Sequence, residues 1–172
     1  MKRFAVLACA LCLGLTAAGC TKDSDTPVSP TTTNALTFGA QMAAALEVPP
    51  VTNTEAQAVC RVSIVLTPAA TGTGYVASFT IAAGGFPATS VFIAGHIHSG
   101  AAGVNGPPVV DTGLSVAAPL LTPTGSLLIT LSGIPVSNEV AQAINANPTG
   151  YYFNLHSPLN PGGVIRGQLV KQ

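Results

Sequence analysis

The sequence predicts an all-β protein, folded as an antiparallel, Greek-key-like β-sandwich or barrel of about 7–8 strands with one short helix. Polar and apolar residues alternate over several short stretches, which is the pattern of half-buried strands. Turn-forming residues separate these stretches, and the chain holds 18 Gly and 14 Pro but no Trp. The connections are too short for the crossover helices that parallel strands need, so we expect antiparallel pairing.

The first twenty residues have the pattern of an export signal. Lys2 and Arg3 precede an apolar run over 4–15, which is followed by small residues up to Cys20. The run is too short to span a bilayer. We therefore assign residues 1–19 to a signal peptide.

Cys20 ends the motif LTAAGC, which resembles the lipobox of bacterial lipoproteins. The resemblance implies a lipid on Cys20 that anchors the protein to a membrane, and secretion without a lipid is the alternative. Thr21 stands where an Asp would imply retention in the inner membrane, so the resemblance implies the outer membrane or the cell surface. Residues 20–34 have almost no apolar surface to bury, and we expect a flexible tether there.

The folded domain is predicted over residues 35–172, and its first three strands share one pattern. The alternating apolar residues of each strand fall on a single face: Leu36, Phe38, Ala40 and Met42; Ala58, Cys60, Val62, Ile64 and Leu66; Tyr75, Ala77, Phe79 and Ile81. Cys60 is the only cysteine of this domain, which excludes a disulfide framework and predicts a buried, inert thiol.

The next predicted strand, Val91–His98, contributes two of the chain's three histidines. Alternation places one set of its residues on the side away from the core: Phe92, Ala94, His96 and His98. The late stretch YYFNLH (151–156) alternates in the same way, and its outward set is Tyr152, Asn154 and His156. The three histidines therefore leave the apolar core near strand ends, where they converge if the two strands are neighbours.

One more strand and one helix are predicted between the two histidine-bearing strands. The strand has three alternating apolar residues on its inner face, Leu127, Ile129 and Leu131. Ser137 is a suitable N-cap for the segment NEVAQAINAN, and Glu139 lies in the first turn, where an acidic side chain is favourable. Pro148 ends the helix.

Three blocks of the sequence resemble the CHRD domain, a module named after chordin and common in bacterial secreted proteins: EVPPV (47–51), HIHSGAAGVNGPPVV (96–110) and YYFNLHSPLNPGGVIRGQL (151–169). The resemblance covers residues 35–172. It implies an extracellular β-sandwich similar to copper/zinc superoxide dismutase, with no established enzymatic activity. The predicted fold class also includes an immunoglobulin-like sandwich as an alternative. Ser157 and Val164 depart from the family pattern, which often has Thr and Glu at these positions.

The histidines permit two interpretations. An H-x-H pair on one strand, His96 and His98, presents two imidazoles on one side, and His156 from a neighbouring strand would complete a three-nitrogen site for Zn or Cu. Alternatively, the three histidines belong to a hydrogen-bonded polar cluster that holds loops together, with Glu47, Asn105, Asn154 and Arg166 as its other members. In this cluster Arg166 either pairs with Glu47 or offers its guanidinium to a ligand.

Composition limits the function. Only 7% of the residues are charged and the formal net charge is zero, so nucleic acid is not an expected partner. A superoxide dismutase site is not expected either, because that enzyme family uses more histidines than the three present here. The favoured hypothesis is a lipid-anchored, non-enzymatic CHRD module that binds a protein or an envelope component through loops at the histidine end. The alternative is a mononuclear Zn- or Cu-binding domain or metalloenzyme.

Overall fold

The computed structural model describes residues 34–70 and 73–172. The predicted signal peptide, Cys20 and most of the predicted tether lie outside these residues. The chain divides into two units, Met1–Thr31 and Thr32–Gln172, and every described residue belongs to the second. Over the described ranges no helix has the length and hydropathy needed to cross a membrane.

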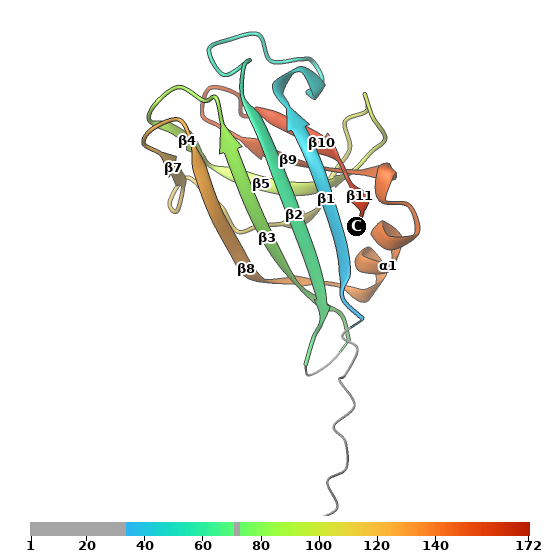
Figure 1. The fold of residues 1–172 in the computed structure, drawn as a ribbon. Coiled ribbons are helices and arrows are strands. Elements are labelled where there is room, and N and C mark those ends of the chain that lie inside the picture. Colours follow the sequence, from blue (N-terminus) through green and yellow to red (C-terminus); the bar gives the residue numbers. More distant parts are fainter. Residues whose placement is uncertain (1–33, 71–72) are drawn as a thin grey trace, which may run out of the picture. The chain divides into compact units, whose positions relative to one another are not determined.

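Nine strands form one antiparallel sheet that curves into a nearly closed barrel (Figure 1). Eight follow one another across the sheet: β6 (Pro108–Asp111), β5 (Ala94–Ser99), β9 (Tyr151–His156), β10 (Ile165–Gln168), β1 (Leu36–Ala43), β2 (Val59–Pro68), β3 (Tyr75–Gly84) and β8 (Leu127–Val136). The ninth strand, β11 (Val170–Lys171), pairs with β1. The predicted all-β antiparallel fold is confirmed.

Short elements complete the described part of the chain. A second sheet has two strands, β4 (Ser90–Phe92) and β7 (Leu120–Thr122). Two 3-10 helices are η1 (Ala44–Leu46) and η2 (Pro148–Gly150), and the α-helix is α1 (Asn138–Ala146). The Ser137 hydroxyl caps this helix by accepting a hydrogen bond from the Val140 amide at 3.2 Å, so the predicted cap is confirmed. The strands exceed the predicted number because the shortest ones carry too few residues to show an alternation.

The core lies between the two sides of the curved sheet. In Figure 1 the long strands β1, β2, β3 and β8 form one side, and β5, β9 and β10 lie behind them. Phe79 of β3 stacks on Phe153 of β9 with a centroid separation of 5.5 Å, which joins the two sides. The predicted inward residues of the first two strands are buried, except Leu36, which is partly buried. They include Cys60, whose burial raises the pKa of its thiol to about 12.

The predicted strand Val91–His98 is interrupted. β4 ends at Phe92 and β5 begins at Ala94, and the two belong to different sheets. Phe92 is fully buried in the core and packs edge-on against Phe86 at 4.8 Å between ring centroids. The prediction that Phe92 shares a side with the histidines is therefore wrong, because strict alternation holds only within one continuous strand.

In β8 the alternation of inward and outward residues also changes partway along the strand. Leu127, Ile129 and Leu131 are partly buried and pack against the core, as alternation predicts. The register with β3 then shifts, and Gly133 adopts a φ of 79°. This bulge lets Ile134 face the core although it lies three residues after Leu131.

Candidate metal centre

The pairing of β5 with β9 brings the histidines together. The two strands are adjacent and antiparallel, with His96 opposite Asn154 and Ala94 opposite His156. Ile97 and Phe153 point into the core, so the histidine side chains occupy the other face of both strands. One ring nitrogen from each of His96, His98 and His156 lies within 4.8 Å of the other two. The sequence predicted that the three histidines converge if their two strands are neighbours, and the structure shows both.

Two of the histidines are oriented by backbone carbonyl groups. Nδ1 of His98 lies 2.8 Å from the carbonyl oxygen of Gly106, and Nδ1 of His156 lies 2.9 Å from that of Pro161. A carbonyl oxygen only accepts hydrogen bonds, so in the neutral rings the proton sits on Nδ1 and Nε2 carries a lone pair. Such contacts are how proteins orient metal-binding histidines.

His96 completes the set with the opposite arrangement. Its Nδ1 lies 3.0 Å from Nε2 of His156, and its Nε2 lies 3.8 Å from Oδ2 of Asp111 on β6. Without a metal, the His96 Nδ1–H donates to the unprotonated Nε2 of His156. A metal bound at Nδ1 leaves the ring proton on Nε2, facing the Asp111 carboxylate, which is the carboxylate–histidine arrangement common behind metal ions.

Burial makes the neutral histidine the favoured form. It lowers the pKa of His98 and of His156, and the neighbouring histidines and Arg166 lower both further, while the two carbonyl contacts oppose the shift. Neutral imidazole is the form that binds metal ions. At neutral pH these two rings would therefore not have to lose a proton before they bind a metal ion.

Arg166 of β10 organises the other half of this polar face. Its Nε donates to Oε2 of Glu47 at 2.6 Å, and its Nη2 donates to Oδ1 of Asn105 at 2.6 Å. Its guanidinium also lies 4.3 Å from the centroid of the Tyr152 ring, which stacks in turn on His98. Arg166 and Glu47 are each only 3% exposed, so this ion pair is buried.

Asn154 lies at the centre of the face. It is opposite His96 on β5 and opposite Arg166 on β10, and it is 1% exposed. Burial raises the pKa of Glu47, whereas Arg166 and the amide of Asn154 oppose that shift. Glu47 fits only because position 163 is glycine: a Cβ there would lie 2.6 Å from Oε1 of the carboxylate, and Gly163 also has a φ of 138°.

The sequence did not point to Glu55, a second buried carboxylate near the site. Glu55 is 3% exposed, and its Oε2 accepts hydrogen bonds from the Ser157 hydroxyl and the Asn160 amide, both at 2.6 Å. These bonds hold the segment 157–163, whose Pro161 carbonyl orients His156. Glu55 has no regular spacing to the histidines, and only the contact across about a hundred residues identifies it.

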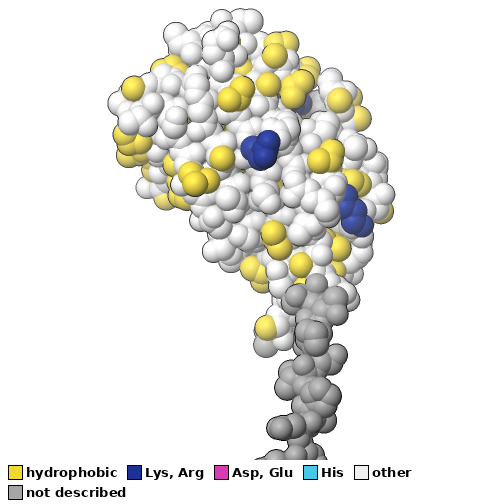
Figure 2. Space-filling view, viewed as in Figure 1, with side chains coloured by type: hydrophobic (Ala, Val, Ile, Leu, Met, Phe, Trp, Pro, Cys, Tyr) yellow, Lys and Arg dark blue, Asp and Glu magenta, His cyan; other side chains and the backbone are white. Residues whose placement is uncertain are grey.

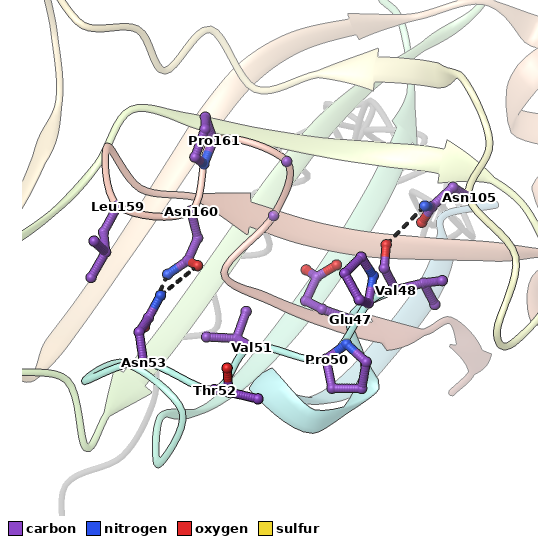
Figure 3. Close-up of a pocket in the computed structure, with 13 residues that line it drawn as sticks. Glu47, Val48, Pro50, Val51, Thr52, Asn53, Asn105, Leu159, Asn160 and Pro161 are labelled. Atoms are coloured by element: carbon purple, nitrogen blue, oxygen red, sulfur yellow. Dashed lines mark hydrogen bonds between the residues drawn. The ribbon is translucent and has the colours of Figure 1, made fainter.

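A cleft of about 360 Å³ lies beside the cluster, between 48–53 and 159–163 (Figure 3). Asn53 Nδ2 donates to Asn160 Oδ1 at 2.8 Å at one end, and Asn105 Nδ2 donates to the Val48 carbonyl at 2.9 Å at the other. Proline-rich walls and these bonds make the cleft preformed.

The surface shows no concentration of basic groups on the face seen in Figure 2. Lys and Arg side chains are isolated there, and hydrophobic side chains are scattered. The absence of nucleic acid among the partners stays a prediction from composition.

The chain belongs to the CHRD family, because the model of the CHRD domain matches residues 38–169. The comparison with curated proteins found no match, and the comparison with solved structures found none either. The family assignment thus agrees with the resemblance in the three sequence blocks, while the likeness to superoxide dismutase or immunoglobulin domains stays a prediction.

Proposed function

We propose that this CHRD domain is an extracytoplasmic module that binds one transition metal ion, Zn or Cu, through His96, His98 and His156. The observation that carries the proposal is the set of contacts behind the rings. Each histidine has one ring nitrogen that points away from the cluster and faces an oxygen acceptor. The acceptors are the Gly106 carbonyl for His98, the Pro161 carbonyl for His156 and the Asp111 carboxylate for His96. A polar scaffold needs no such uniform orientation, whereas a metal site does.

The geometry suits a small ion with nitrogen ligands. Nitrogens bound to one tetrahedral Zn ion lie about 3.3 Å apart, given Zn–N bonds of about 2.0–2.1 Å. The 3.0 Å between His96 Nδ1 and His156 Nε2 is close to that spacing, and His98 lies within 4.8 Å of both. Imidazole nitrogen suits Zn and Cu in particular.

Binding, rather than catalysis, is the role that we propose. Hydrolysis by a metal-bound water requires a free general base beside the metal. Glu47 is bonded to Arg166, Glu55 accepts from Ser157 and Asn160, and Asp111 faces His96, so the three carboxylates near the cluster already have partners. A two-metal redox site would need more histidines than the chain contains.

Metal analysis of the purified full-length chain tests this proposal. We expect about one equivalent of Zn or Cu after loading and dialysis, and loss of that equivalent in His98→Ala. Cys60→Ala is the control, because it removes the buried free thiol and leaves the histidines intact. A wild-type chain that retains no metal, or a His98→Ala chain that retains it fully, would contradict the proposal.

We also propose that a lipid on Cys20 anchors the domain to a membrane, at the outer membrane or the cell surface. The support is the LTAAGC motif, followed by a polar stretch long enough to separate the domain from the membrane. Cys20→Ser should move the protein from the membrane fraction to the soluble fraction, whereas Cys60→Ser should not. Unchanged membrane association of Cys20→Ser would remove the anchor and leave secretion as the alternative.

A second candidate function is the binding of a protein or envelope component in the cleft of Figure 3, without a metal. The preformed cleft beside the histidines favours it. Leu159 lines the cleft and is 56% exposed, so Leu159→Asp should weaken sedimentation of the metal-free chain with isolated cell envelopes. Val116→Asp, at an exposed valine that does not line the cleft, is the control. Equal sedimentation of both variants and the wild type would exclude this role.

A further inference from the structure

Buried polar atoms without a hydrogen-bond partner gather at the histidine cluster. In the described part of the chain four buried side-chain atoms lack a partner: Glu47 Oε1, His98 Nε2, Asn145 Oδ1 and Asn154 Oδ1. Three of the four belong to the polar face of β5, β9 and β10 or contact it. Unpartnered buried polar atoms are rare, because each costs about 1–3 kcal/mol, and a group of them calls for an explanation such as a bound ion.

The three clustered atoms have the same chemical character. His98 Nε2 carries a lone pair, since the ring proton is held at Nδ1 by the Gly106 carbonyl. Asn154 Oδ1 and Glu47 Oε1 are oxygens, and they accept hydrogen bonds as well. All three atoms can accept and none of them can donate, so a positive ion is a species that would satisfy them together.

Asn154 is the best placed of the oxygen-bearing residues. It lies directly opposite His96 on the neighbouring strand, and His156 lies two residues further along its own strand, on the same side of the sheet. It is 1% exposed, so water does not compete freely for its oxygen. Its position on a strand between two paired strands also fixes its backbone, unlike that of a loop residue.

We propose that Oδ1 of Asn154 is a fourth protein ligand of the metal, which makes the site three nitrogens and one oxygen. This inference rests on the proposed function. A carboxamide oxygen is a hard ligand, so the site should favour divalent ions over Cu(I), which prefers sulfur. Four protein ligands also match a binding site, whereas a catalytic zinc site keeps one position for water.

Co(II) binding to the full-length chain tests the role of Asn154, with CoCl₂ as the probe. Asn154→Ala should weaken Co(II) binding by about tenfold or more and alter the visible d–d absorption of the bound ion. Asn154→Asp supplies a different oxygen ligand, and it should keep binding while shifting the absorption. The matched control is Asn145→Ala on α1, which removes the fourth unpartnered atom and should change neither the affinity nor the spectrum.

Three results would overturn the proposal. An Asn154→Ala chain with the wild-type affinity and spectrum would leave a three-histidine site without this ligand. Weaker binding with an unchanged spectrum, accompanied by a lower melting temperature of the metal-free chain, would assign Asn154 to folding alone. Absence of Co(II) binding to the wild type would remove the metal site itself, and with it both proposals. If Asn154→Ala does not fold, a wild-type spectrum for Asn154→Asp overturns the proposal equally.

Discussion

The two faces of β5, β9 and β10 are both largely buried, yet they are built from opposite kinds of side chain. The inner face carries fully buried apolar groups such as Phe153, Leu155 and Ile165. The outer face carries Asn154 and Arg166, which are 1% and 3% exposed. The inner face is covered by the other side of the sheet, whereas the outer face is covered by loops.

The difference teaches that burial has two separate causes in this domain. Apolar side chains on the inner face gain free energy directly on leaving water. Polar side chains on the outer face cost free energy when buried, unless hydrogen bonds or a bound ion compensate them. The inner face therefore supplies stability, and the outer face is where a binding function has to be sought.

The largest expected effect is on the inner face. Phe153→Ala should lower the free energy of unfolding by about 3–5 kcal/mol, because it removes a fully buried ring that stacks on Phe79. Urea unfolding of the metal-free chain measures this. The control is the adjacent outward residue, where Tyr152→Phe keeps the ring and should cost less than about 1.5 kcal/mol. A loss for Phe153→Ala smaller than the control's would contradict the assignment of stability to the inner face.

The next largest effect on the free energy of unfolding is expected from the buried ion pair of the outer face. Arg166→Met should destabilise the domain by about 3 kcal/mol, since it leaves the Glu47 carboxylate buried without a cation. The double variant Glu47→Gln with Arg166→Met should recover more than half of that loss, because no charge then remains to compensate. Equal instability of the single and double variants in urea unfolding would show that packing, not charge, determines the cost.

A smaller effect should follow from the loop that covers the outer face. Ser157→Ala removes the hydroxyl that donates to the buried Glu55 carboxylate, and it should cost about 2 kcal/mol. Ser157→Thr retains a hydroxyl and should cost less. Because the same segment holds the Pro161 carbonyl behind His156, we also expect weaker Zn binding in Ser157→Ala, measured by competition with a chelating dye. Wild-type affinity in Ser157→Ala would separate this loop from the metal centre.

The smallest effect concerns the titratable thiol of the inner face. The raised pKa of Cys60, about 12 against 9.0 without burial, means that the folded chain keeps a proton that the unfolded chain loses. The stability contribution of this proton is full below pH 9 and is lost as the pH rises, by about 1 kcal/mol between pH 9 and pH 10. The stability difference between wild type and Cys60→Ala should therefore shift by that amount under reducing conditions. A constant difference would contradict the burial of the thiol.

The local alternation of polar and apolar residues was enough to predict the inner face. It did not predict the loops that cover the outer face. Alternation identified the buried residues of β1 and β2, and it placed His96, His98 and His156 away from the core. It failed at Phe92, because a break at Ile93 separates β4 from β5 and resets the alternation. It also gave no sign of Glu55, which meets Ser157 across 102 residues.

The sequence by itself determined the all-β class, the helix cap at Ser137 and the direction in which most strand residues point, because each depends on a few consecutive residues. The tertiary structure alone decided that β5 lies beside β9 and that the outward histidines are enclosed. These features depend on contacts such as His96 with His156 and Arg166 with Glu47, which are 60 and 119 residues apart. Such contacts form only when segments far apart in the sequence pair, and no local periodicity encodes them.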